Sequence, residues 1–300
     1  MKAFSGIRRD DFQWQRSALT PNAFAGKRVA IVGGTNGIGR ALAVELVRHG
    51  AEVLVVGRTF RDQGVANLVF VQADLARMTE ARRVAIELPA ETLDMLIFTT
   101  GIMAGRERAV SPEGIELDLA VSYLNRFVMV REMARRLGSK RKEDAKYKPR
   151  IFVWGFPGTN QKGNLNDFNS ESSYSLMAAH SNTVIGNEAL VLDGAIRYPS
   201  VNFYGMNPGL IKSNIRSGTL GEGTLGLKLT EWVIGGLFPT LEEYTTIILP
   251  LLSSPDIESH SGAMFNRHGD PIYPSKSLAS GSCLQQVHDQ SERLASRVLS

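Results

Sequence analysis

Cysteine is almost absent from this sequence, in which Cys283 is the only one among 300 residues. A single thiol excludes a disulfide within the chain and a metal site built from several cysteines, and it is typical of a reducing compartment. Long apolar runs are missing as well. The most apolar segment, residues 245–252, is short and is interrupted by Pro250. We therefore expect a soluble, cytoplasmic protein with no membrane span and no metal site.

An excess of charge of one sign is also missing. The 34 lysines and arginines nearly balance the 30 aspartates and glutamates, which leaves a net charge of +4. Much of the positive charge lies in residues 135–150, but that run mixes both signs and precedes an apolar segment. It predicts a solvated loop rather than a nucleic-acid surface, so the expected partner is a small molecule.

Short apolar segments alternate with longer amphipathic ones from residue 28 onward. The short ones are rich in β-branched and aromatic residues and read as buried strands. They cover residues 28–34, 52–57, 68–72, 93–98, 150–155 and 201–207. The longer ones carry apolar residues at helical spacing, for example over 39–50, 115–137 and 183–198. This alternation predicts an α/β fold of Rossmann type, a doubly wound parallel sheet within three α/β/α layers.

No shift in composition marks a second domain. We expect residues 27–300 to form one domain and residues 1–26 to form an arm that packs on its surface or contacts another subunit. Residues 216–236 alternate glycines with apolar residues, a composition that suits either a mobile lid over a pocket or a plain surface loop.

A glycine-rich loop follows the first predicted strand and opens the first predicted helix. Such a loop makes a tight turn, lets the backbone approach a pyrophosphate and presents free N–H groups at a helix start. With strand before and helix after, the spacing predicts dinucleotide binding. The residues concerned are Gly33, Thr35, Asn36, Gly37, Ile38 and Gly39.

The end of the second predicted strand indicates which dinucleotide. An acidic residue there would hold the adenosine ribose of NAD(H), but the sequence has Gly57 and Arg58. An arginine can pair with a 2′-phosphate and stack on adenine, so we expect the cofactor to be NADP(H). Arg40 is either a second contact of this kind or a solvated helix residue.

These motifs, taken in order, resemble the short-chain dehydrogenase/reductase family and its retinol-dehydrogenase-like branch. The resemblance rests on the loop spacing G-x-x-x-G-I-G, on "ADL" (73–75), on "LIFTTGIMA" (96–104), on "NPGLIKSNI" (207–215) and on "SGAMFNRHGDPIYPS" near the end. It spans most of residues 27–300. It implies further cofactor contacts at Asp74, Leu75, Thr99, Gly101, Pro208, Gly209 and Ser213.

The same resemblance makes the catalytic positions atypical. When "VIG" (184–186) is used as the anchor, the family tyrosine falls at Met177 and the family lysine at Ser181. The family serine falls at Gly155 or Phe156, and the family asparagine at Ser122. Methionine has no proton to donate, and a neutral serine cannot lower the pKa of a tyrosine as the family lysine does. The usual mechanism therefore cannot run from these positions.

Neighbouring residues offer other proton sources. Tyr174 shares a helical face with Met177 and Ser181, although helical side chains lean toward the N-terminus and would aim it away from the nicotinamide. A water held by Ser181 and Ser122 is another source. His180 has a suitable side chain but projects to a different side of the helix, where we expect a polar surface or subunit-interface residue.

The leading hypothesis is an NADP(H)-dependent oxidoreductase with Tyr174, Ser181 and Ser122 as catalytic residues. Its substrate would be a medium-sized, largely apolar carbonyl, alcohol or enone. Two alternatives stay open: an inactive NADP(H)-binding regulatory protein, and a non-redox isomerase or cyclase that keeps the pocket. The family resemblance also implies a homo-oligomer through the long helices.

Overall fold

One eight-stranded sheet forms the centre of the protein, in a computed structural model that describes residues 6–103, 105–141, 145–209 and 239–300. Its strand order is β3-β2-β1-β4-β5-β6-β7-β8, with β1 to β7 parallel and β8 antiparallel to β7. The strands are β1 (Arg28–Val32), β2 (Glu52–Gly57), β3 (Leu68–Gln72), β4 (Met95–Phe98), β5 (Arg150–Trp154), β6 (Asn202–Met206), β7 (Met264–Phe265) and β8 (Pro271–Ile272). The doubly wound fold predicted from the sequence is confirmed.

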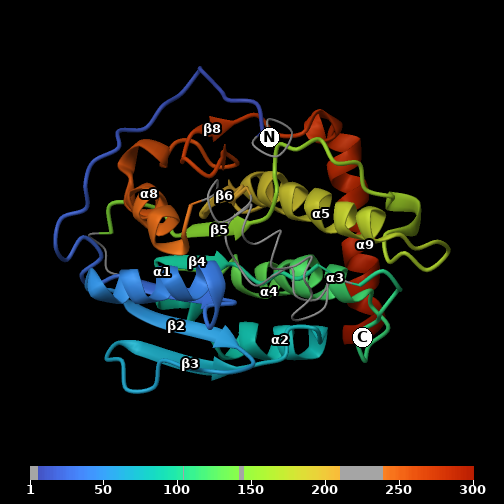
Figure 1. The fold of residues 1–300 in the computed structure, drawn as a ribbon, viewed down its shortest axis with the longest axis horizontal. Helices are drawn as coiled ribbons and strands as arrows, with labels where there is room; N and C mark the ends of the chain where they lie inside the picture. Colours follow the sequence, from blue (N-terminus) through green and yellow to red (C-terminus); the bar gives the residue numbers. More distant parts are fainter. Residues whose placement is uncertain (1–5, 104, 142–144, 210–238) are drawn as a thin grey trace, which may run out of the picture.

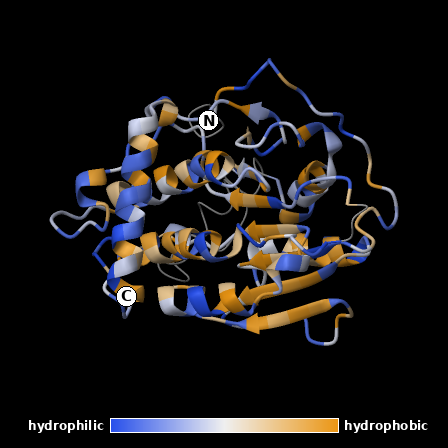
Figure 2. Cartoon of the chain, turned by 180° about the vertical axis from the view of Figure 1, so that it is seen from behind, coloured by the Kyte–Doolittle hydropathy of each residue, from blue (hydrophilic) through white to orange (hydrophobic). Residues whose placement is uncertain are grey.

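Helices cover both faces of the sheet (Figure 1). They are α1 (Gly37–Arg48), α2 (Met78–Glu87), α3 (Leu117–Leu119), α4 (Asn125–Met133), α5 (Leu176–Arg197), α8 (Leu241–Ser253) and α9 (Gly281–Leu299). Short helical turns span Ala90–Thr92, Ala120–Leu124, Leu165–Asp167, Pro255–Ile257 and Lys276–Ala279. One apolar cluster joins the sheet to α1 and α8, and the other joins it to α2, α4, α5 and α9. Figure 2 shows the apolar residues concentrated on the strands and on the helix sides that face them.

The N-terminal segment from residue 6 to 26 packs against the last two strands and α8. The indole nitrogen Nε1 of Trp14 donates to the carbonyl of Gly269 at 2.6 Å, and the amide of Arg9 donates to the carbonyl of Pro271 at 2.9 Å. Phe24 is fully buried. These contacts keep the arm on the side of the sheet that carries α1 and α8. The segment 216–236, expected to be a lid or a loop, lies outside the described residues.

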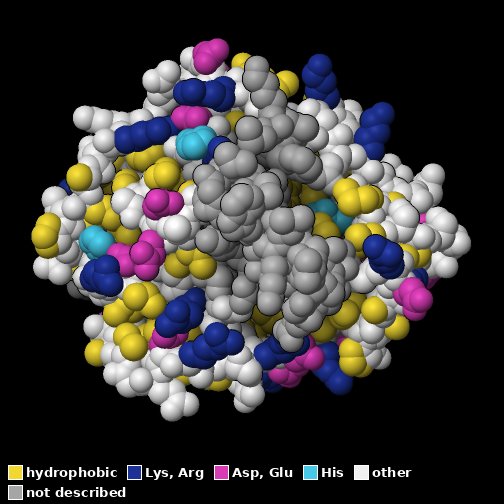
Figure 3. Space-filling model, in the orientation of Figure 1, with side chains coloured by type: hydrophobic (Ala, Val, Ile, Leu, Met, Phe, Trp, Pro, Cys, Tyr) yellow, Lys and Arg dark blue, Asp and Glu magenta, His cyan; other side chains and the backbone are white. Residues whose placement is uncertain are grey.

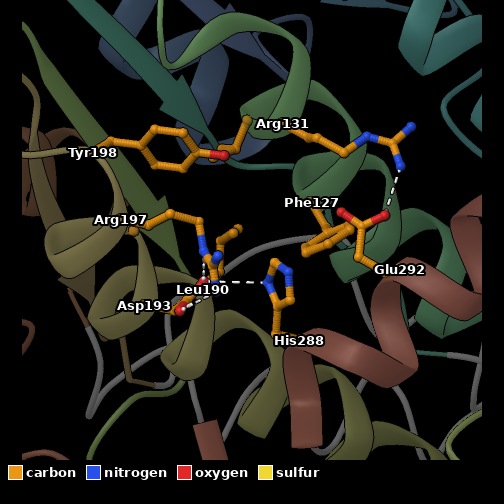
Figure 4. Close-up of a pocket in the computed structure, with 10 residues that line it drawn as sticks. Phe127, Arg131, Leu190, Asp193, Arg197, Tyr198, His288 and Glu292 are labelled. Carbon is orange, nitrogen blue, oxygen red and sulfur yellow. Dashed lines mark hydrogen bonds and ion pairs between the residues drawn. The ribbon is translucent and has the colours of Figure 1, made fainter. Parts of the chain in front are cut away.

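The C-terminal helix α9 lies across α4 and α5. The Tyr123 and Ser291 hydroxyl oxygens are 2.6 Å apart and share a hydrogen bond, and Leu294 is buried beside them. A shallow pocket between the three helices is edged by charged groups (Figure 4). There Arg197 pairs with Asp193 at 2.9 Å, and Arg131 of α4 pairs with Glu292 of α9 at 2.9 Å. The first pair lies within α5, whereas the second links α4 to α9, and a contact of 3.3 Å between Asp193 and Nδ1 of His288 links α5 to α9.

The surface gives no sign of one dominant charge on the face shown in Figure 3, where basic and acidic side chains are interspersed among apolar ones. Among the described helices, none combines the length and apolar character that crossing a bilayer requires.

Candidate active site

A cavity lies at the carboxyl ends of the central strands, and the empty space in and in front of it, open solvent included, is about 930 Å³. Segments that follow β1, β4, β5 and β6 all contribute to its lining, as expected for a ligand site in a doubly wound sheet. Its lining residues are Ile38, Thr99, Thr100, Gly101, Ile102, Met103, Ser122, Arg126, Trp154, Gly155, Phe156, His180, Thr183, Val184, Asn187, Pro208 and Gly209. Of the predicted cofactor contacts, Ile38, Thr99, Gly101, Pro208 and Gly209 are therefore brought together.

The glycine loop has the geometry that a dinucleotide requires. Gly33 has φ +91° and Gly37 has φ +53°, conformations that residues with a Cβ rarely adopt. A Cβ at Gly39 would lie 2.3 Å from the carbonyl oxygen of Gly33 and 2.3 Å from the Thr99 hydroxyl oxygen. Asn36 precedes α1 and makes no side-chain cap, so the first N–H groups of the helix remain available to an anion. The residues present fit a dinucleotide phosphate.

Arg58 lies beside this loop at the end of β2. A Cβ at Gly57 would meet the Thr35 hydroxyl oxygen at 2.5 Å, which shows how closely the loop approaches the strand end. Arg58 is exposed, and its side chain has no hydrogen bond or ion pair with any described residue. Arg40, in contrast, is held by Asp62 through contacts of 2.9 and 2.5 Å.

The remaining predicted contacts lie further out or cannot be placed. Asp74 is exposed after β3, where its carboxylate accepts from the amide of Ala76 at 3.2 Å, and Leu75 is buried next to it. Neither lines the cavity. Ser213 lies outside the described residues.

The helical segment that crosses the cavity wall contains a π-helical turn over Ala120–Leu124. Turns of this type occur often at functional sites. The side-chain nitrogen Nδ2 of Asn125 donates to the carbonyls of Ala120 (2.7 Å) and Val121 (2.6 Å). The side-chain nitrogen Nδ2 of Asn187 donates to the carbonyl of Ser122 (2.8 Å). Side chains thus satisfy carbonyls of the irregular turn, which fixes the place of Ser122.

Asp118 connects this wall to α5. Its side chain has no exposure to solvent, and its carboxylate accepts from the Ser122 hydroxyl at 2.5 Å. Its other oxygen lies 2.9 Å from Nδ1 of His180, whose side chain is only 12% exposed and lines the cavity. His180 was expected to be a polar surface or subunit-interface residue on another side of the helix, but α5 is turned so that its imidazole faces the cavity.

The cavity-facing side of α5 carries His180, Thr183, Val184 and Asn187. Met177 does not line the cavity and is 59% exposed. The Ser181 hydroxyl donates to Oε1 of Gln161 at 3.1 Å and to the carbonyl of Met177 at 2.7 Å, also away from the cavity.

Tyr174 precedes α5 and does not line the cavity either. Its hydroxyl donates to the carbonyl of Gly105 at 2.7 Å, and burial raises its pKa. Of the three residues proposed from the sequence as catalytic, the structure thus places only Ser122 in the cavity wall.

Asp118 and Arg126 are site residues that the sequence analysis missed. Together with Ser122 they are polar residues spaced four apart within a largely apolar helical segment. That spacing is the one signal from which a polar stripe facing a cavity can be inferred. An imidazole held by a buried carboxylate is a common acid–base arrangement, because the carboxylate fixes the tautomer and stabilises the protonated ring.

A family model described as short chain dehydrogenase matches residues 27–144. Over 292 residues the chain is 44% identical to an uncharacterized oxidoreductase of Saccharomyces cerevisiae. The alignment covers 95% of this chain and 93% of that protein. It is also 26% identical over 290 residues to retinol dehydrogenase 14 of Mus musculus, covering 88% and 84%.

Solved structures show the same fold. A Shigella flexneri short chain dehydrogenase complexed with NADP has a TM-score of 0.58 at 15% identity and covers 83% of this chain and 99% of that one. An NADH-dependent reductase complexed with NAD has a TM-score of 0.59 at 17% identity and covers 85% and 100%. The chain thus belongs to the short-chain dehydrogenase family and is an oxidoreductase of that family, whose members use a nicotinamide dinucleotide.

Proposed function

We propose that this oxidoreductase uses NADP(H) and acts on a medium-sized, largely apolar carbonyl, alcohol or enone, with His180 as the group that exchanges the proton. The observation that carries the proposal is the contact between Nδ1 of His180 and the buried carboxylate of Asp118 at the cavity wall. Among the described lining residues, Ser122 also contacts this carboxylate, but His180 is the only one with an imidazole.

The cofactor supplies or accepts a hydride when bound. In the direction of reduction, the protonated His180 ring donates its Nε2 proton to the substrate oxygen as hydride reaches the carbon, which leaves an alcohol and a neutral imidazole. In the direction of oxidation, neutral Nε2 accepts the hydroxyl proton. In both directions the carboxylate of Asp118 accepts a hydrogen bond from Nδ1–H, so the ring keeps one orientation.

The lining supports an apolar substrate. Ile102, Met103, Trp154, Phe156 and Val184 contribute large apolar surfaces to the cavity. The ring of Phe156 meets that of His180 edge to face, with centroids 6.1 Å apart. Apolar walls exclude water and strengthen the electrostatic interactions of the few polar groups.

Arg58 supports the preference for NADP(H), because it is a cation with no partner among the described residues beside the loop that would hold the pyrophosphate. Tyr174, or a water held by Ser181 and Ser122, becomes a secondary candidate for the proton source. The cytoplasmic location and the homo-oligomer also remain parts of the proposal. Since α9 covers much of α4 and α5, we place any contact between copies elsewhere.

The test is a titration of the purified protein with NADPH and NADH, followed by nicotinamide fluorescence, and then a screen of apolar aldehydes, ketones and enones for NADPH oxidation. We expect NADPH to bind more tightly than NADH. Arg58→Ala should weaken NADPH binding about 10- to 100-fold and leave NADH binding unchanged, since it removes a charge-assisted contact to the 2′-phosphate.

Three outcomes would contradict the proposal. If Arg58→Ala weakened the binding of NADPH and NADH equally, Arg58 would not be the contact to the 2′-phosphate. Product formation without a change in nicotinamide absorbance would favour the isomerase or cyclase, and cofactor binding without any turnover would favour the regulatory protein.

A further inference from the structure

Arg126 is a buried cation in the wall of the cavity. It lies on α4, is 2% exposed and lines the cavity together with Thr100, Trp154 and Asn187. It is the only arginine or lysine among the described lining residues. Burial lowers the pKa of Arg126 to about 9. That value still leaves the guanidinium charged at neutral pH, as arginine is throughout proteins.

The guanidinium is held by neutral acceptors from three different elements. Nη1 donates to the carbonyl of Trp154 (2.5 Å) and to Oδ1 of Asn187 (2.7 Å). Nη2 donates to the carbonyl of Thr100, and Nε lies 3.4 Å from the Thr100 hydroxyl oxygen. The ends of β4 and β5 and the cavity face of α5 therefore fix the charge in one place.

No carboxylate among the described residues forms an ion pair with Arg126. The carboxylate of Asp118 favours the charged form of Arg126, but it accepts its hydrogen bonds from Ser122 and His180 instead. Arg150 provides a contrast within the same molecule. It is also 2% exposed, but it pairs with Glu258 at 3.0 Å. A buried charge is costly without a counter-ion, so the unpaired state of Arg126 calls for a reason.

We infer that Arg126 supplies the fixed positive charge of the active site, which favours a ligand with an anionic oxygen and stabilises the negative charge that develops on the substrate oxygen. In the family resemblance this chain has Ser181 where a lysine is expected, and Ser181 points away from the cavity. A cation from α4 would take over the electrostatic part of that role. The catalytic half of the inference rests on the proposed function, whereas the preference for anions does not.

A preorganised charge beside the apolar side chains of the cavity acts more strongly on a developing oxyanion than the same charge in bulk water. Four of the five guanidinium N–H groups already have acceptors among the described residues. Arg126 therefore acts on the cavity mainly through its field, and the hydrogen bonds serve to position it.

The test compares benzoate with benzamide, two probes of nearly the same shape of which only the first is charged. Their binding to the full-length protein is measured by calorimetry at one salt concentration, without cofactor. We expect benzoate to bind about tenfold more tightly than benzamide to the wild type and to Arg126→Lys, and both probes to bind equally to Arg126→Met. His180→Gln serves as the control for the other basic side chain of the cavity.

Equal binding of the two probes to the wild type would overturn the inference. So would a preference that survives in Arg126→Met or disappears in His180→Gln. If Arg126→Met does not fold, Arg126→Gln, which is neutral but keeps side-chain hydrogen-bond donors, takes its place and should bind both probes equally. Because the assay needs no turnover, absence of NADPH oxidation would reject the proposed function without touching this result.

Discussion

One hydrogen bond, between Nδ1 of His180 and the carboxylate of Asp118, determines how the imidazole can act in proton transfer. The carboxylate is fully buried and holds Nδ1 of the ring, so the opposite nitrogen is the one left for a ligand. Because the partner of Nδ1 is a carboxylate, which only accepts hydrogen bonds, we assign the proton to Nδ1. The arrangement makes Asp118 a positioning residue for the proton transfer.

Asp118→Asn should therefore lower kcat about 10²-fold or more while leaving the affinity for NADPH unchanged, because an amide can stabilise the wrong tautomer of His180 and cannot balance its charge. Steady-state kinetics with the best carbonyl from the screen measures this. Asp193→Asn is the matched control, since Asp193 pairs with His288 outside the cavity at 3.3 Å. Equal effects of the two variants would show that Asp118 has a merely structural role.

At the scale of single residues, a sequence shows the backbone requirements of the glycine loop but not the direction in which the side chains of α5 point. Backbone requirements at Gly33 and Gly39 follow from local spacing, so they are visible in a sequence. The direction in which His180 points depends on where α5 begins and on its rotation against the sheet. Packing over distant residues sets that rotation, and a motif anchor at residues 184–186 does not report it.

Helix α5 illustrates what close packing between elements demands. A Cβ at Gly186 would lie 2.8 Å from ring atoms of Tyr123, and the Tyr123 hydroxyl is tied to Ser291 of α9. The ring cannot easily move aside. Gly186 therefore allows α5 to approach the helical segment that carries Ser122 and Arg126.

Gly186→Ala should lower the free energy of unfolding by about 1–3 kcal/mol through overpacking, in spite of the gain of about 1 kcal/mol in helix propensity. Denaturant unfolding measures this. Gly281→Ala, at the start of α9, has open space around the new methyl group and should be neutral or slightly stabilising. A Gly186→Ala protein as stable as the control would contradict the packing described here.

Glu188 links α5 to the segment after β8. Its buried carboxylate accepts from the amide and hydroxyl of Ser275 and from the amide of Gly158, while burial raises its pKa. Between the unfolded pKa and this raised value the folded protein binds more protons than the unfolded chain. The stability that Glu188 contributes is thus present below the unfolded pKa and is lost as the pH rises through the folded pKa.

Glu188→Gln should remove this dependence, so that its stability falls less than that of the wild type when the pH is raised from about 4.5, the usual range of a glutamate. Thermal unfolding across the pH series would show it. Glu107→Gln, at an exposed position, should keep the wild-type slope. Parallel pH profiles of wild type and Glu188→Gln would mean that another group titrates.

Elements with strong patterns were predicted well. The ranges expected for β2 and β3 match the observed strands, and β1, β4, β5 and β6 differ only at their ends. The two-residue strands β7 and β8 were missed, because two residues show no periodicity. The π-helical turn was missed for a related reason, since its geometry depends on Asn125 and Asn187 satisfying free carbonyls.

For the molecule as a whole, the two clusters of apolar residues explain why the site lies where it does. Sheet and helices are held together from both faces, and the strand ends of β1, β4, β5 and β6 meet at one open edge. Helix α9 packs on α4 and α5. The ion pair between Arg131 of α4 and Glu292 of α9 is seen in Figure 4. His180 and Arg126 both stand on helices, α5 and α4, whereas residues 99–103, 155–156 and 208–209 of the lining lie in loops.

The central claim is that this molecule is an active NADP(H)-dependent oxidoreductase whose proton passes through His180. The most direct measurement is NADPH oxidation with an apolar carbonyl by the wild type, His180→Gln and Tyr174→Phe, with NADPH affinity determined for each. We predict that His180→Gln lowers kcat about 10²- to 10⁴-fold with unchanged affinity and that Tyr174→Phe keeps nearly full activity. Loss of activity in Tyr174→Phe but not in His180→Gln would contradict the account.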